Sequence, residues 1–113
     1  MIKRAAIAAA LAVSVSATAG QKLNEEFCAV MAQASHMIMS AHQGGMDMSH
    51  ALSVVDEAWR ESVSAQQYRD TRWAVRDLVI RAYEHPRHAS PEGKRYAAAK
   101  YRDEMHVQCL RSL

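Results

Sequence analysis

Residues 73–84, WAVRDLVIRAYE, decide the fold of this chain. At about 100° per residue, this stretch separates into an apolar arc and a charged arc on opposite sides of a helix. The apolar arc holds Ala74, Val75, Leu78, Val79 and Ala82. With the preceding turn included, the charged arc holds Arg69, Arg72, Arg76, Asp77, Arg81 and Glu84. This pattern predicts the central helix of a small helical bundle.

Trp73 and Ile80 depart from this division. They lie seven residues apart and nearly superimposed, in the middle of the charged arc. An aromatic residue beside arginine is typical of protein interfaces, so Trp73, Ile80, Arg69 and Arg76 form a candidate partner-binding surface. The alternative is that a neighbouring segment of the chain covers Trp73 and Ile80 and makes them part of the core.

The N-terminal residues have the features of an export signal. Lys3 and Arg4 precede an apolar run, residues 5–15, that is short for a membrane span. Ala17-Thr18-Ala19 then supplies the small residues of a signal-peptidase site. We expect residues 1–19 to be a signal peptide and residues 20–113 to be one domain, periplasmic or secreted. The alternative is an uncleaved anchor or a buried helix.

Removal of the signal peptide changes the charge balance. The whole chain has 14 Lys and Arg against 12 Asp and Glu, and residues 1–19 contain two of the basic residues. The exported part therefore has 12 charges of each sign. Such a balance gives no general attraction to nucleic acid or anionic lipid, so we expect no nucleic-acid partner and no stable membrane insertion after cleavage.

Cys28 and Cys109 lie near opposite ends of the exported part. In an oxidising compartment they predict a disulfide, with free thiols or an intermolecular bridge as alternatives. The spacing is not Cys-x-x-Cys, which argues against a redox-active pair.

Capping residues and breakers delimit the remaining helices. The first follows Asn24 and ends at Gly44-Gly45, and the last runs from Pro91 to about residue 111. Another begins after Asp47 or Ser49. We expect an all-α bundle of about four helices in which one disulfide links the first and last helix. In an up-down-up-down bundle the two cysteines lie at the same pole.

Two details of these helices stay open. Ser64 and Gln67 resemble a capping box, which favours a break between the second and third helices, although no Gly or Pro separates them. On the first helix, periodicity places Met31 and Met37 in the core and Gln43 on the outward face.

Several positions resemble a group of small secreted proteins of unknown function from proteobacteria and their phages. They are Cys28, residues 37–44, Ala82-Tyr83 with Pro86, residues 101–104, and Cys109. The resemblance spans most of residues 25–110 and implies an exported helical domain with a cysteine pair, but no reaction. Relatives often have an Arg near the position of His42, a single Gly and fewer methionines.

The segment 31–50 contains five methionines and three histidines. Thioether and imidazole groups suit Cu(I), so this segment is a candidate periplasmic copper site. The candidate ligands are Met39, His42, Met46, Met48 and His50. The alternative is that the methionines fill the core and the histidines lie on the surface. Copper is the only cofactor that the sequence suggests.

His85, His88 and His106 suggest a third function, an acid-responsive periplasmic chaperone, against the alternative of ordinary solvated histidines. No nucleophile elbow, phosphate loop or zinc-protease motif is present, so we expect no enzymatic activity. The interpretation that the sequence favours is a small exported protein that binds another macromolecule of the cell envelope, either an envelope protein or a second copy of itself.

Overall fold

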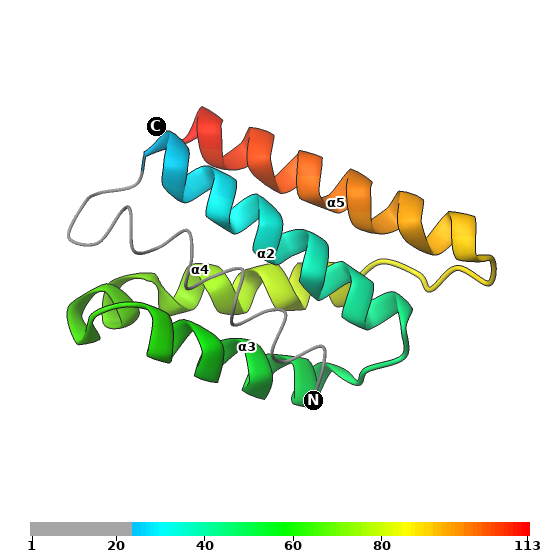
Figure 1. Ribbon diagram of the computed structural model, residues 1–113, viewed down its shortest axis with the longest axis horizontal. Coiled ribbons are helices and arrows are strands. Elements are labelled where there is room, and N and C mark those ends of the chain that lie inside the picture. Colours follow the sequence, from blue (N-terminus) through cyan, green and yellow to red (C-terminus); the bar gives the residue numbers. More distant parts are fainter. Residues whose placement is uncertain (1–23) are drawn as a thin grey trace.

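The computed structural model describes residues 24–113, which form four α-helices and no strand. The helices are α2 (Glu25–Gln43), α3 (Met48–Ser62), α4 (Ala65–Tyr83) and α5 (Pro91–Arg111), and successive helices run in opposite directions (Figure 1). The predicted all-α bundle is confirmed. The predicted signal peptide, residues 1–19, lies outside the described residues. No described helix is both long and apolar enough to cross a lipid bilayer.

Each helix begins at a polar side chain that accepts a main-chain N–H three residues further on. These capping residues are Asn24, Asp47, Ser64 and Ser90. At Ser64 the capping box is complete, because the Gln67 side chain accepts the Ser64 N–H in return, at 3.1 Å. The break between α3 and α4 is therefore encoded locally, and the two helices are separate.

The turn between α2 and α3 depends on glycine. Gly44 caps α2, and Gly45 adopts a φ of +95°, a conformation that is strained for a residue with a side chain. A Cβ at Gly45 would also lie 3.1 Å from an Arg87 nitrogen. The turn thus brings α3 back along α2 and leaves room for the loop that follows α4.

Helix α2 lies at the centre of the bundle and packs against the other three helices. Helix α5 lies along it, and the α3–α4 hairpin packs against α2 as well (Figure 1). The core forms where the apolar sides of the four helices meet. Its most completely buried large apolar side chains are Val30, Ile38, Met39, Val55, Val79 and Tyr101.

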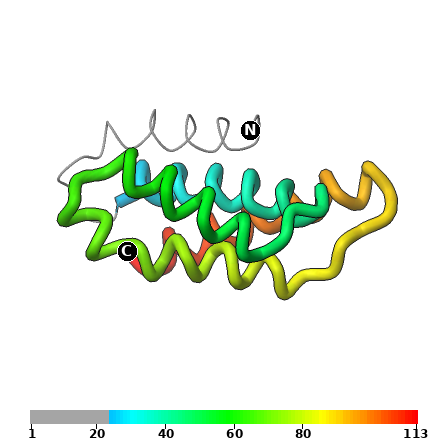
Figure 2. The backbone as a smooth tube through the Cα atoms, turned by 90° about the horizontal axis from the view of Figure 1, so that it is seen from below, coloured from blue at the N-terminus to red at the C-terminus, as the bar shows by residue number. Residues whose placement is uncertain are grey.

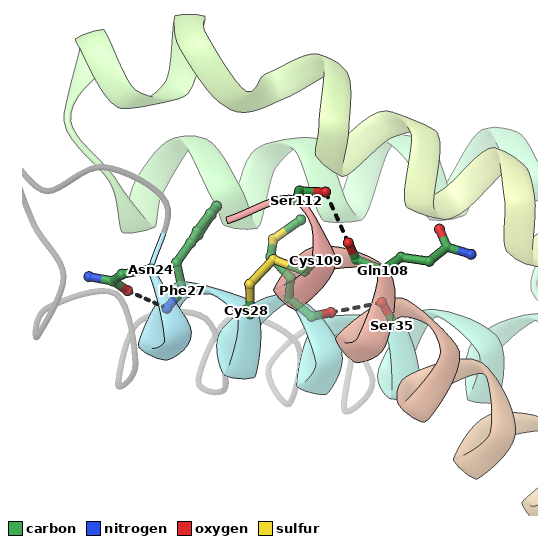
Figure 3. The surroundings of a disulfide bond; sticks show 8 residues. Asn24, Phe27, Cys28, Ser35, Gln108, Cys109 and Ser112 are labelled. Carbon is green, nitrogen blue, oxygen red and sulfur yellow. Dashed lines mark hydrogen bonds between the residues drawn. A yellow bond between two sulfur atoms is a disulfide. The ribbon is translucent and has the colours of Figure 1, made fainter.

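The disulfide joins Cys28, in the first turn of α2, to Cys109, in the last turns of α5 (Figure 3). Their Cα atoms are 5.5 Å apart, although 81 positions separate them in the sequence. The predicted bridge between the first and last helix is confirmed, with both cysteines at one pole of the bundle. The disulfide closes a loop that includes nearly all the described residues.

Polar side chains also link the helices. The Tyr101 hydroxyl of α5 donates to the carbonyl of Leu78 in α4. The Trp59 indole N–H of α3 donates to the Thr71 hydroxyl of α4 at 2.8 Å. Among the described residues, no buried side-chain nitrogen or oxygen lacks a hydrogen-bond partner. The helices are therefore held in one arrangement by directional contacts as well as by apolar packing.

Candidate interaction surface on α4

The outward side of α4 carries an exposed apolar ridge. Trp73 is 70% exposed and Ile80 is 38% exposed, so neither is covered by the helices that pack around α4. The Trp73 indole N–H donates to the Asp70 carbonyl at 3.1 Å, which holds the ring against its own helix. The alternative that a neighbouring segment buries Trp73 therefore does not hold for the described residues. We call Trp73 and Ile80 the apolar ridge.

Arginines lie on one side of this ridge. Arg69, Arg72 and Arg76 are all exposed, and none forms an ion pair with a residue that the structure describes. Arg69 donates to the Gln66 side chain at 2.8 Å, and the Arg72 guanidinium lies 5.4 Å from the centre of the Tyr68 ring. We call Arg69, Arg72 and Arg76 the arginine side of α4.

Two acidic residues, Asp70 and Asp77, lie on the other side of the ridge, and both are already engaged. Asp77 pairs with Arg81 at 2.8 Å, and Asp70 accepts two hydrogen bonds from Gln66. The two sides of the ridge therefore differ. One carries positive charge with no acidic partner among residues 24–113, and the other carries the paired Asp77 and the hydrogen-bonded Asp70.

A groove between α3 and α4 adjoins the arginine side. It has a volume of about 340 Å³, and Arg72 and Arg76 contribute to its wall on α4. Ser49 and Ser53 line it from α3. Its apolar lining includes core side chains that are almost fully buried, namely Val55, Trp59, Val75 and Val79. We call it the α3–α4 groove.

A second groove, between α4 and α5, lies on the acidic side of the ridge. It has a volume of about 270 Å³ and is the more apolar of the two. Trp73, Asp77 and Arg81 line it from α4, and Cys109 of the disulfide lines it from α5. Its deeper lining consists of four core side chains that each retain slight exposure: Phe27, Met31, Leu78 and Met105.

The predicted copper ligands are not gathered on one surface. Met39 is 1% exposed and belongs to the core, where its sulfur accepts from the Gln43 amide at 3.6 Å. His42 is buried beside Tyr83, and its Nε2 lies 2.7 Å from the His85 carbonyl oxygen. Both side chains are thus committed to contacts inside the protein.

The other three predicted copper ligands lie beyond α2. Met46 is half-buried against the core, whereas Met48 and His50 are exposed in the first turn of α3. Across the described residues, no three or more His, Cys, Asp and Glu side chains form a group able to hold a metal ion. The five candidate ligands of segment 31–50 therefore lie in different environments: some in the core, one against the loop that follows α4, and some in the solvent.

Gln43 is a structural residue that the sequence pattern did not reveal. Periodicity placed it on the outward face of its helix, but it is 1% exposed. Its amide group contacts the connection between α4 and α5, accepting from the His88 N–H and donating to the Pro86 carbonyl. Figure 2 shows this connection at the same end of the bundle as the α2–α3 turn. The partners are main-chain groups, which carry no sequence signal.

The predicted acid-sensing histidines are spread over the surface. His85 and His88 are exposed in the connection between α4 and α5, and His106 is half-buried on α5. A different histidine has a perturbed environment: partial burial, together with the positive charge of Arg102, lowers the pKa of His36. Tyr83, which titrates in the alkaline range, is also affected: burial and the negative charge of Asp47 raise its pKa.

Comparisons with family models, curated proteins and solved structures find no match. The resemblance to small secreted proteins of proteobacteria and phages therefore stays an expectation.

Proposed function

We propose that this protein binds another protein of the bacterial cell envelope through the apolar ridge on α4, and that it acts as a binding module rather than an enzyme. The contact centres on Trp73 and Ile80, with Arg69 and Arg76 beside them. The exposure of the Trp73 ring is the observation that carries this proposal.

The physical reason is the cost of leaving an indole in water. Burying the exposed part of a Trp side chain contributes on the order of 3 kcal/mol, which is the scale of an interface hot spot. The Trp73 ring is held by its hydrogen bond to the Asp70 carbonyl, so a partner finds it already oriented. Less side-chain entropy is then lost on binding.

Two features support an extracytoplasmic location. The sequence of residues 1–19 has the pattern of a signal peptide, and a disulfide closes the described domain. Disulfides of this kind form and persist in oxidising compartments. An envelope protein is therefore the partner class that we propose, with a second copy of the chain as the alternative.

The test is site-specific crosslinking in the producing cell. A photo-crosslinking amino acid is placed at position 73, and a matched control carries it at position 96, where Tyr96 is 65% exposed on α5. We expect adducts with one partner from position 73 and not from position 96. Equal labelling at both positions, or none at 73, contradicts the proposal. An adduct with a second copy of the chain would show that the protein forms a homodimer through this surface.

A further inference from the structure

The α3–α4 groove has an unusual combination of surfaces. The half-buried Leu52 lies in it above core side chains that include Trp59 and Val79, and two arginines stand on its α4 wall. Its volume of about 340 Å³ is at the low end of the range for small-ligand sites. The groove therefore offers an apolar contact directly beside positive charge.

Neither arginine of this groove forms an ion pair with a described residue that lines it. Asp56 is the only acidic residue among the described residues that line the groove. Its carboxylate already accepts from the Tyr68 hydroxyl at 2.5 Å and pairs with Arg60 at 3.4 Å. Arg72 and Arg76 are thus left to interact with an external anion, and Arg69 extends the same positive strip along α4.

This charge distribution disfavours a second copy as the occupant. A two-fold contact centred on the arginine side would bring the arginines of both copies together. Like charges that face one another across an interface repel and oppose association. The occupant that complements the groove therefore carries negative charge where this chain carries Arg72 and Arg76.

An anionic lipid surface is a poorer match than a peptide. The exported part of the chain has equal numbers of acidic and basic residues, so it has no general attraction to an anionic membrane. The core side chains Val55, Val75 and Val79 close the groove from below. Because this floor is closed, an acyl chain cannot pass from the groove into the core.

From these observations we infer that the α3–α4 groove binds an acidic peptide segment of the partner protein. An apolar side chain of that segment packs on the half-buried Leu52, and neighbouring carboxylates pair with Arg72 and Arg76. Guanidinium groups bind carboxylates through two parallel hydrogen bonds, which gives direction as well as attraction. This inference rests on the proposed function, because it names the chemistry of the same partner.

The experiment is a selection from a random dodecapeptide library displayed on phage, with the purified, disulfide-bonded protein as target. We expect enriched peptides to carry Asp or Glu beside Leu, Ile, Phe or Trp. Enrichment of neutral or basic peptides, or no enrichment at all, overturns the inference. One enriched peptide, made synthetically with a fluorescent label, then serves as the probe for affinity measurements.

The variants separate charge from shape. The double variant Arg72→Gln, Arg76→Gln should weaken peptide binding about tenfold or more. The control Arg95→Gln, Arg111→Gln removes two exposed arginines from α5 and should leave the affinity unchanged. Ser53→Phe should fill the groove from α3 and block binding without changing the charge. Unchanged affinity in the Arg72/Arg76 variant or in Ser53→Phe overturns the inference.

Two further readouts distinguish the possible failures. If vesicles containing phosphatidylglycerol bind the protein and the Arg72/Arg76 double variant abolishes that binding, the groove is a membrane site and the peptide assignment is overturned. If position 73 crosslinks a partner while the Arg72/Arg76 double variant still crosslinks it equally, the proposed function stands and the groove assignment fails. If position 73 crosslinks nothing, the proposed function itself fails.

Discussion

The side-chain oxygen of Gln43 accepts the main-chain N–H of His88 at 2.7 Å, across 45 positions of sequence. The amide nitrogen of Gln43 donates to the Pro86 carbonyl at 3.0 Å. One buried side chain at the end of α2 thus holds the connection between α4 and α5 in place. Tyr83 adds a second contact at this end, because its hydroxyl donates to the Met46 carbonyl at 2.6 Å.

Gln43→Ala should destabilise the protein by about 1–3 kcal/mol, because it removes the two hydrogen bonds to the loop and the one to the Met39 sulfur and leaves a buried space. It should also speed hydrogen exchange at the His88 amide. Gln33→Ala, an exposed position on the same helix, is the matched control and should change neither quantity. Urea unfolding and amide exchange by NMR measure both. Unaltered exchange at His88 would show that the contact does not hold the loop.

The two tryptophans should respond differently to truncation. Trp59 is 2% exposed, stacks on Phe27 and donates to Thr71, so Trp59→Ala should cost about 3–5 kcal/mol. Trp73→Ala should change stability by no more than about 0.5 kcal/mol, because its ring is exposed. Urea unfolding measures both. In a Trp59→Phe variant, acrylamide should quench the remaining Trp73 fluorescence efficiently; a protected Trp73 would contradict the exposed ridge.

Loss of the disulfide should strongly destabilise the protein. The bridge between Cys28 and Cys109 closes a loop with a sequence separation of 81. In the chain-entropy model a loop of that size stabilises the fold by roughly 4.5 kcal/mol. The Cys28→Ala, Cys109→Ala double variant should therefore unfold at much lower urea concentration than the oxidised protein. Equal midpoints would mean that four-helix packing alone supports the domain.

The stability should fall in alkaline solution. Burial raises the pKa of both Tyr101 and Tyr83 above the ordinary tyrosine value near 10. Above about pH 10 the unfolded chain releases these protons before the folded chain does, so each raised pKa makes unfolding easier as the pH rises. Tyr101→Phe lowers the stability at neutral pH, because the bond to the Leu78 carbonyl is lost, but its alkaline slope should be smaller. An unchanged slope would contradict the assignment.

The opposite sign applies to His36 in acid. Its folded pKa is lowered by partial burial and by Arg102, so its contribution is present above the unfolded value near 6.5 and is lost as the pH falls. His36→Gln should therefore flatten the decline of stability between about pH 7 and pH 5. His50→Gln, at an exposed position, is the control. If the stability of both variants falls with pH in the same way, His36 does not contribute to the loss of stability in acid.

The helix ends and the break between α3 and α4 were predictable from sequence because their causes are local. Asn24, Ser64 and Ser90 cap N–H groups three residues away, and Gly44-Gly45 ends α2. The pairing of Cys28 with Cys109 was predicted from the expected export to an oxidising compartment, and four antiparallel helices agreed with it, since that topology puts both at one pole. These features need only the order of residues and the geometry of a helix.

The burial of Met39 and Gln43 and the exposure of Trp73 were decided by the tertiary structure. Helix α2 is surrounded by three helices, so its buried arc is wider than an amphipathic pattern indicates. Trp73 faces outward because α2 and α3 pack against other sides of α4. The periodicity of a helix shows which residues share a face, but the neighbours of that face come from segments distant in sequence, and they determine what is buried.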